Sequence, residues 1–186
     1  MDPAIFLDRD GVVIENRDEY VRSWNDVIFL PGALEALRTA RISPFRIVVV
    51  TNQSAVGRGI ISLADAEEIN SKFINKVASE GGRLDGLFMC PHSPAENCSC
   101  RKPRPGLLFN AAAKMNIDIS QSYMIGDALS DLEAGQAAGV LQALLVRTGR
   151  GAIQEKLPAA GKLHPFLAFD TLARALAYIH SNRLRG

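Results

Sequence analysis

Residues 3–11 of this chain, Pro-Ala-Ile-Phe-Leu-Asp-Arg-Asp-Gly, decide its fold class. The apolar run over residues 3–7 is followed directly by Asp8, Arg9 and Asp10. A short apolar run that ends abruptly in charges and glycine predicts a buried strand. We therefore expect residues 3–7 to form a strand in the interior of the protein, with two carboxylates where that strand ends.

Strand-like and helix-like segments alternate along the rest of the chain. We predict further strands at residues 45–50, 84–89, 123–125, 140–146 and 166–169. We predict helices at residues 32–40, from Ser62 onward, and at residues 106–115, 129–138 and 172–179. This alternation is typical of a doubly wound, Rossmann-like α/β fold, in which helices cover both faces of a parallel sheet. Since the sequence contains no repeat and no long linker, we expect a single domain over residues 1–186.

The ends of two helices can be placed from single residues. Ser62, followed three residues later by Asp65, has the pattern of a capping box and predicts that a helix begins there. Gly81 and Gly82 should end that helix, and Gly139 stands where the helix at residues 129–138 should end.

Composition excludes several classes of protein. The 186 residues are 47% hydrophobic and 22% charged, which is ordinary for a globular protein and rules out disordered or collagen-like chains. A net charge of +1 gives no general attraction to nucleic acid or anionic lipid. No apolar run approaches the ~18 residues of a membrane span, and Asp2, Arg9 and Asp10 would interrupt a signal peptide. We expect a cytoplasmic monomer with no nucleic-acid or membrane partner.

Polar side chains follow three of the predicted strands. They are Asp8 with Asp10, Thr51 and Asp127, and ligands of open α/β sheets bind outside such strand ends. Two neighbouring carboxylates repel each other, and a divalent cation held by oxygens, Mg²⁺ above all, would compensate them. Asp131 lies one helical turn after Asp127 and could orient the group. Alternatively, Asp8 and Asp10 only form a loop and Asp127 caps a helix.

All three cysteines lie close together in a loop at residues 90–100. Cys90, His92, Cys98 and Cys100 would complete a tetrahedral Zn²⁺ shell with no open position, which is the structural type of zinc site. An odd number of cysteines cannot be fully paired in internal disulfides. The alternative is a reduced surface loop whose cysteines are incidental.

The order of these features resembles the haloacid dehalogenase-like phosphatases. The chain has Asp-x-Asp-Gly at residues 8–11, then Thr51, then Lys102 before a helix, then Gly-Asp-x-x-x-Asp at residues 126–131. The resemblance implies that Asp8 is the nucleophile that becomes an aspartyl phosphate. It implies that Asp10 protonates the leaving alkoxide and later deprotonates water, which requires Asp10 to be partly protonated while Asp8 is ionised.

The same resemblance implies roles for the remaining strand-end residues. Asp8, the Asp10 backbone carbonyl and Asp127 would bind Mg²⁺. Thr51 and Lys102 would hold the oxygens of the transferring phosphoryl group. Taken alone, Thr51 could be a turn residue and Lys102 a solvated surface charge.

A smaller group within that superfamily is more similar still. Residues 6–11, residues 51–54 and the Cys-x-His…Cys-x-Cys loop that ends in Arg101, Lys102 and Pro103 resemble the zinc-containing D,D-heptose 1,7-bisphosphate phosphatases and the related histidinol-phosphate phosphatases. The match spans roughly residues 4–150. Because 43 positions separate Asp8 from Thr51 and 51 separate Thr51 from Lys102, there is no room for a separate cap domain.

Six positions are expected to bind the rest of the substrate. They are Tyr20, Asn52, Gln53, Ser54, Arg58 and Arg101, and the arginines suit a second phosphate or sugar hydroxyls. Arg58 could instead be a solvated loop charge. The chain departs from its relatives at Ala128, where many of them have Lys or Arg, and at residues 55–59, which read Ala-Val-Gly-Arg-Gly where the heptose phosphatases usually have Gly-Ile-Ala-Arg-Gly.

Three functions remain open from the sequence. The first is Mg²⁺-dependent hydrolysis of a small phosphorylated sugar, D-glycero-D-manno-heptose 1,7-bisphosphate in cell-envelope precursor synthesis, with removal of the 7-phosphate. The second is hydrolysis of histidinol phosphate. The third, of another class, is a non-catalytic, zinc-stabilised binding module.

Overall fold

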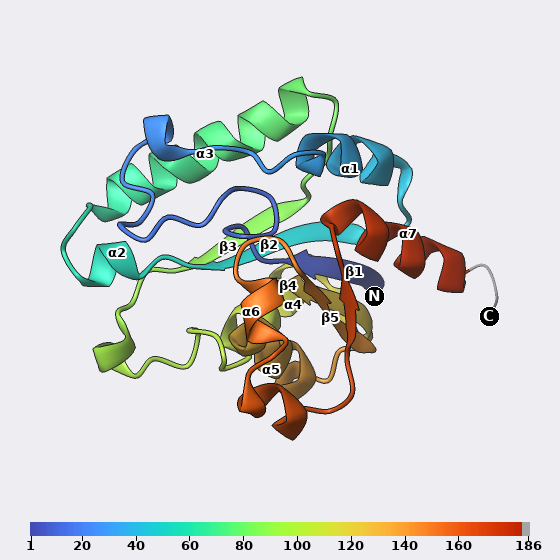
Figure 1. Ribbon diagram of the computed structural model, residues 1–186. Helices are drawn as coiled ribbons and strands as arrows, with labels where there is room; N and C mark the ends of the chain where they lie inside the picture. Colours follow the sequence, from blue (N-terminus) through green and yellow to red (C-terminus); the bar gives the residue numbers. More distant parts are fainter. Residues whose placement is uncertain (184–186) are drawn as a thin grey trace.

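A parallel sheet of six strands, in the order β3-β2-β1-β4-β5-β6, lies at the centre of the computed structural model, which describes residues 1–183 (Figure 1). The strands are β1 (Asp2–Leu7), β2 (Arg46–Asn52), β3 (Gly86–Cys90), β4 (Ile117–Gly126), β5 (Gln142–Val146) and β6 (Leu167–Phe169). The chain runs outward from β1 to β3 and then crosses to β4 on the other side of β1. This reversal creates the crevice in which doubly wound proteins bind ligands, and it confirms the predicted fold class.

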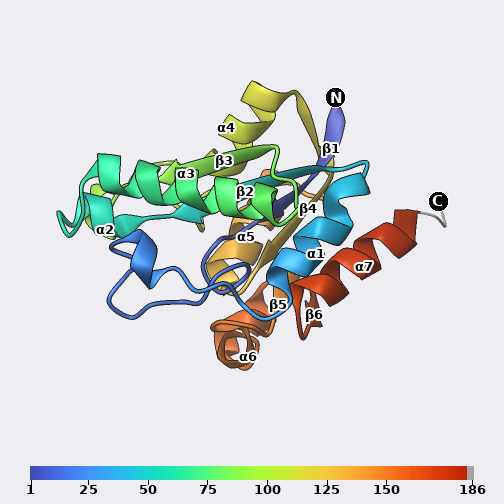
Figure 2. The same cartoon turned by 90° about the horizontal axis from the view of Figure 1, so that it is seen from above.

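Helices cover both faces of the sheet (Figures 1 and 2). One face carries α1 (Ala33–Thr39), α3 (Leu63–Ser79) and α7 (Leu172–Arg183), and the other carries α4 (Gly106–Met115) and α5 (Leu129–Ala138). Successive side chains of a strand point to opposite faces, so Ile5 and Leu7 of β1 pack into one core and Ala4 and Phe6 into the other. All four are fully buried, which explains why residues 3–7 are apolar without alternation.

The predicted helix ends are confirmed. The Ser62 hydroxyl accepts a hydrogen bond from the Asp65 backbone N–H at 3.0 Å, and the Asp65 carboxylate accepts one from the Ser62 backbone N–H at 2.9 Å. Gly139, with a φ of 83°, follows α5 in the left-handed conformation, which favours glycine. Glu80 is the C-cap of α3, and Gly81, with a φ of 81°, comes next.

Several boundaries differ from the prediction. β4 begins at Ile117 rather than at residue 123, because residues 117 and 118 pair with the start of β1 across a register shift. The polar composition of residues 118–122 hides this pairing in the sequence. β3 begins at Gly86, β5 at Gln142 and β6 at Leu167, one or two residues later than predicted, and α7 continues to Arg183 rather than ending at residue 179.

Two short helices were not predicted. They are α2 (Ser54–Gly57) and α6 (Gly151–Gln154), each a single turn that follows a strand. A helix of four residues is too short to show the 3.6-residue hydrophobic period. Four 3-10 helices, at Trp24–Asp26, Ala40–Ile42, Pro94–Glu96 and Pro158–Lys162, were missed for the same reason.

The connections leave the carboxyl ends of the strands accessible. Residues 8–32, between β1 and α1, form a long loop with one 3-10 helix at Trp24–Asp26. Within residues 1–183 no separate cap domain is inserted, as the short intervals in the sequence indicated. Among the helices of these residues, none has the length and apolar character needed to span a membrane.

Candidate active site

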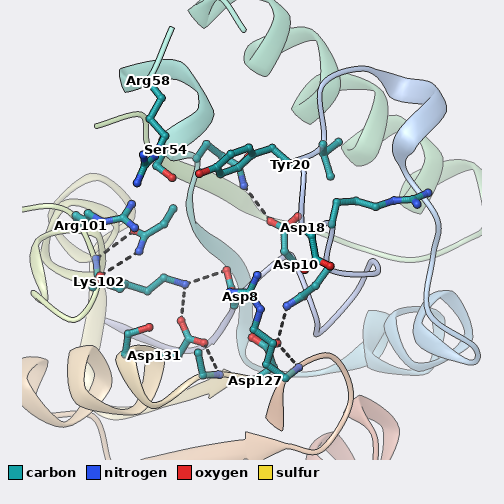
Figure 3. A pocket seen from close by; sticks show the side chains of 18 residues that line it. Asp8, Asp10, Asp18, Tyr20, Ser54, Arg58, Arg101, Lys102, Asp127 and Asp131 are labelled. Atoms are coloured by element: carbon teal, nitrogen blue, oxygen red, sulfur yellow. Dashed lines mark hydrogen bonds and ion pairs between the residues drawn. The ribbon is translucent and has the colours of Figure 1, made fainter. Parts of the chain in front are cut away.

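A cavity of about 330 Å³ opens at the carboxyl ends of β1, β2 and β4 (Figure 3). Its lining includes ten of the residues predicted for the site: Asp8, Asp10, Tyr20, Asn52, Gln53, Ser54, Arg58, Arg101, Lys102 and Asp127. Thr51 is fully buried just beneath it. The structure therefore brings together side chains that are as much as 119 positions apart in the sequence, from Asp8 to Asp127.

The end of β1 places Asp8 at the centre of the cavity. The backbone N–H of Asp8 still donates to the Ile125 carbonyl of β4, at 2.9 Å, so the residue is held by the sheet. Gly11 then turns the chain back with a φ of 81°, and a Cβ at that position would overlap the Asp127 carboxylate. Glycine is required there by both its backbone angle and its close approach to Asp127.

Lys102 is buried beside Asp8 and Asp131. Its Nζ lies 2.9 Å from Asp8 Oδ1 and 2.6 Å from Asp131 Oδ1, and it donates to the Val50 carbonyl at 2.8 Å. Burial lowers the pKa of Lys102, but the charges of Asp131 and Asp8 outweigh burial and raise the pKa above its ordinary value. Lys102 is only 3% exposed, which excludes the alternative of a solvated surface charge.

The carboxylates themselves are crowded. Burial raises the pKa of Asp8 well above its ordinary value, Lys102 opposes the rise, and the nearby charges of Asp131 and Asp127 add to it. Burial and the charge of Asp131 likewise raise the pKa of Asp127 to about 7, against the lowering effects of the Arg150 N–H and of Lys102. The cluster thus carries more negative charge than Lys102 alone offsets.

Asp10 has its own set of hydrogen-bond partners. Its carboxylate accepts hydrogen bonds from Gln53 Nε2 at 2.9 Å and from Thr51 Oγ1 at 3.4 Å. Arg9 donates to both carboxylate oxygens, from Nε at 3.1 Å and from Nη2 at 3.2 Å. Arg9 is 1% exposed, and its Nη1 donates to Asn70 Oδ1 of α3 at 2.7 Å. No role was predicted for Arg9, although a charge directly after a buried strand is a signal for one.

Asp127 is not a helix cap. The N-cap of α5 is Ala128, whose N–H donates to the Asp131 carboxylate at 3.1 Å. Asp127 is 2% exposed, and its Oδ2 accepts from Asn16 Nδ2 at 2.9 Å and from the Arg150 N–H at 2.8 Å. Neither Asn16 nor Arg150 was predicted for the site. Arg150 follows the predicted strand at residues 140–146 by four positions, but the sequence alone does not show that this strand lies beside the one that precedes Asp127.

The donor atoms around Asp127 fit a hard cation. Carboxylate oxygens of Asp8, Asp127 and Asp131 lie within 4.8 Å of one another. The Oδ1 atom of Asn16 is buried and has no hydrogen-bond partner among the described residues, so an unused oxygen acceptor also lies beside Asp127. Excess negative charge and oxygen ligands are what Mg²⁺ selects.

The Cys/His cluster is compact. The three Sγ–Sγ distances among Cys90, Cys98 and Cys100 are 3.3–3.6 Å, and His92 Nδ1 lies 3.5 Å from Cys90 Sγ and 3.3 Å from Cys100 Sγ. Four ligands around a Zn²⁺ with bonds of ~2.3 Å would have sulfurs ~3.8 Å apart, so only a small expansion is needed. Burial raises the pKa of Cys98, but hydrogen bonds from Cys100 and Cys90 outweigh burial and lower that pKa to about 7. Burial raises the pKa values of the Cys90 and Cys100 thiols, so a bound metal would have to displace their protons.

The cysteine loop leads directly into Lys102. Asn52 at the end of β2 accepts from the Lys102 N–H with its Oδ1, at 3.1 Å, and donates to the Lys102 carbonyl with its Nδ2, at 3.0 Å. Arg101 Nη1 contacts the His92 carbonyl at 3.4 Å. The side-chain amides of Asn52 and Gln53 thus bind protein groups here, although both residues were predicted for substrate binding.

The other residues that were predicted to bind substrate lie around the opening of the cavity. Figure 3 shows Tyr20, Ser54 and Arg58 on the side opposite Asp127 and Asp131. They come from the loop after β1 and from α2 with the residue that follows it.

The fold and this arrangement of carboxylates around a buried lysine define a haloacid dehalogenase-like hydrolase. A family model described as HAD-hydrolase-like matches residues 99–175. The chain is 36% identical to the D-glycero-beta-D-manno-heptose-1,7-bisphosphate 7-phosphatase of Neisseria meningitidis serogroup A, covering 94% of this chain and 93% of the relative. It is 40% identical to the protein of the same name from Escherichia coli K12, covering 85% and 86%.

A solved structure agrees with these relatives. The D,D-heptose 1.7-bisphosphate phosphatase of B. bronchiseptica, crystallised with magnesium and phosphate, superposes with a TM-score of 0.89 at 35% identity and covers 97% of this chain and 99% of its own. The chain belongs to the D-glycero-beta-D-manno-heptose-1,7-bisphosphate 7-phosphatase family, whose members are phosphoric monoester hydrolases.

Proposed function

We propose that this chain removes the 7-phosphate of D-glycero-D-manno-heptose 1,7-bisphosphate in a Mg²⁺-dependent reaction that passes through an aspartyl phosphate. The observation that carries the proposal is the placement of Asp8 within 2.9 Å of Lys102, with Asp10 two residues away in the same cavity. The names of the relatives support the choice of substrate.

Asp8 and Asp10 carry out different parts of the reaction. An oxygen of Asp8 attacks phosphorus, the bond from phosphorus to the sugar oxygen breaks, and Asp10 delivers a proton to that oxygen. Asp10 then takes a proton from water, the water oxygen attacks phosphorus, and the bond to Asp8 breaks to release inorganic phosphate. Gln53, Thr51 and Arg9 orient Asp10 for both proton transfers.

Lys102 positions the reacting groups. Its Nζ touches Asp8 Oδ1 and can also reach an oxygen of the transferring phosphoryl group, where a buried cation stabilises developing charge. Asp131 holds the other side of the Nζ at 2.6 Å and so fixes the direction in which Lys102 points. The Thr51 hydroxyl, which donates to Asp10 at 3.4 Å, would turn to donate to a phosphoryl oxygen when substrate binds.

The residues also fit two metal ions. Asp8, the Asp10 carbonyl and Asp127 would hold Mg²⁺, which when bound shields the phosphate and Asp8 from each other's negative charge. Cys90, His92, Cys98 and Cys100 would hold a structural Zn²⁺. Tyr20, Ser54, Arg58 and Arg101 would contact the hydroxyls of the sugar. We further propose that the enzyme is a cytoplasmic monomer.

A panel of substrates tests the proposal. Phosphate release is measured from the heptose bisphosphate, sugar monophosphates and histidinol phosphate, each with and without Mg²⁺. We expect the highest kcat/KM for the heptose bisphosphate, only with Mg²⁺. A preference of about tenfold or more for histidinol phosphate would contradict the proposed substrate. No Mg²⁺-dependent release from any ester, and no effect of Asp8→Asn, would favour a zinc-stabilised binding module.

A further inference from the structure

The turn after β5 is fixed to the active site by its backbone. The Thr148 hydroxyl donates to the Gly11 carbonyl at 2.6 Å, and the Arg150 N–H donates to Asp127 Oδ2 at 2.8 Å. Gly149 has a φ of 56°, and a Cβ there would collide with both Asp127 and Gly11. The position of the Arg150 Cα is therefore set by the same residues that form the floor of the cavity.

The side chain of Arg150 is free by contrast. It is exposed and lines the cavity, and within residues 1–183 its guanidinium has no hydrogen-bond or ion-pair partner. Among the other cations of the lining, Lys102 is occupied by Asp8 and Asp131, Arg17 donates to the Asp26 carbonyl at 3.1 Å, and Arg101 contacts the His92 carbonyl at 3.4 Å. Arg58 is also exposed, but it lies on the side of the cavity opposite Asp127 (Figure 3). A guanidinium without a partner, carried by a backbone that is fixed to the floor of the cavity, can bind an anion without first breaking an existing ion pair.

The charge of the cavity explains why such a cation is needed. The lining includes five carboxylates, those of Asp8, Asp10, Asp18, Asp127 and Asp131. A second phosphate on the substrate adds a charge of about −1.5 to −2 near them at neutral pH. On the wall that Asp127 shares with α5, the neighbouring lining residues Ala128 and Ser130 carry no charge, so Arg150 is the cation placed to attract that phosphate.

We propose that Arg150 determines specificity by binding the phosphate that is not hydrolysed. This inference rests on the proposed function, because it assigns a residue to the second phosphate of a bisphosphate substrate. The planar guanidinium can donate two parallel hydrogen bonds to a phosphate, which a lysine cannot. Lys102 and Thr51 remain the residues that hold the phosphoryl group undergoing transfer.

Arg150→Ala tests the inference, since alanine keeps the backbone N–H that binds Asp127. The kcat/KM is measured for heptose 1,7-bisphosphate and for heptose 7-phosphate, which share the reacting group. We expect the ratio of the two values to fall by about 10- to 100-fold, mainly through the KM of the bisphosphate. Arg150→Lys should restore part of that ratio.

Two controls distinguish a failure of this inference from a failure of the proposed function. Arg174→Ala removes an exposed arginine of α7 with the same change in net charge and should leave the ratio unaltered. Equal losses on both substrates in Arg150→Ala, or no loss on either, would overturn the inference alone. A wild-type enzyme that releases no phosphate from the bisphosphate in the presence of Mg²⁺ would overturn the proposed function and this inference together.

Discussion

Arg9 is the residue whose position is hardest to explain without catalysis. Its side chain is 2% exposed and pairs with Asp10, whose side chain is 24% exposed. Burying a guanidinium is costly unless its donors are satisfied, and Arg9 meets this requirement with two bonds to Asp10 and one to Asn70. The pair fixes the plane of the Asp10 carboxylate relative to α3, which makes Arg9 a positioning residue.

Arg9→Met should therefore impair the step in which we propose that Asp10 donates a proton. Because a sugar alkoxide needs that proton and p-nitrophenolate does not, we expect kcat to fall about 100-fold on the sugar phosphate and far less on p-nitrophenyl phosphate. Steady-state kinetics on both substrates measure the difference, with Arg174→Met as the control. Equal losses on the two substrates would indicate a general structural defect.

The sequence made some site residues predictable and hid others. Asp8, Thr51 and Asp127 were found because each directly follows an apolar strand, and Lys102 because it follows the cysteine cluster. Asn16 was not found because it reaches Asp127 from an irregular loop, where no periodicity marks which side chains turn inward. Arg150 was missed because only the fold shows that β5 ends beside β4.

At the scale of elements, the loop from β3 to α4 connects the proposed zinc site to the proposed catalytic lysine. Cys90 is the last residue of β3, and Cys100 lies two residues before Lys102. The paired hydrogen bonds between Asn52 and the Lys102 backbone tie the end of this loop to β2. Ordering of the loop should thus govern where the Lys102 amine lies.

Cys98→Ser should lose bound zinc and lower turnover while most of the sheet stays folded. Serine is a poor zinc ligand, and the loss of one of four ligands typically weakens a structural site severely. Zinc content is measured by mass spectrometry of metals, turnover by phosphate release, and folding by circular dichroism. Ser99→Ala, an exposed neighbour in the same loop, is the control. Normal turnover by a zinc-free Cys98→Ser protein would refute the coupling.

At the scale of the whole molecule, two apolar cores on opposite faces of the sheet stabilise the fold. Phe73 of α3 is fully buried in one of them and stacks on Phe29 of the loop after β1, with ring centroids 5.7 Å apart. Phe73 thereby links the helix that anchors Arg9 through Asn70 to the loop that borders the active site.

Phe73→Ala should lower the free energy of unfolding by about 3–5 kcal/mol, because it leaves a cavity in a core that cannot fully collapse. Chemical denaturation monitored by circular dichroism measures the change. Phe109→Ala provides the matched control, since Phe109 is 48% exposed on α4 and should cost far less. A loss of less than about 1 kcal/mol for Phe73→Ala would contradict the assignment of this core.

The overall fold was predictable because strand-like apolar segments and helix-like amphipathic segments alternate along the chain. Apolar composition alone is enough to predict buried strands at residues 3–7, 45–50 and 140–146. Strand order, the register shift in β4 and the one-turn helices α2 and α6 were not predictable in this way. They depend on contacts between segments far apart in the chain, which a local pattern does not encode.

The most direct test of the account is a search for covalent phosphate on Asp8. The enzyme is mixed with heptose bisphosphate and Mg²⁺, quenched in acid within one turnover and treated with borohydride, which reduces an aspartyl phosphate to homoserine. We predict homoserine at position 8 by peptide mass spectrometry, dependent on Mg²⁺ and absent in Asp8→Asn. Full phosphate release with no modification at Asp8, together with an active Asp8→Asn variant, would contradict the account.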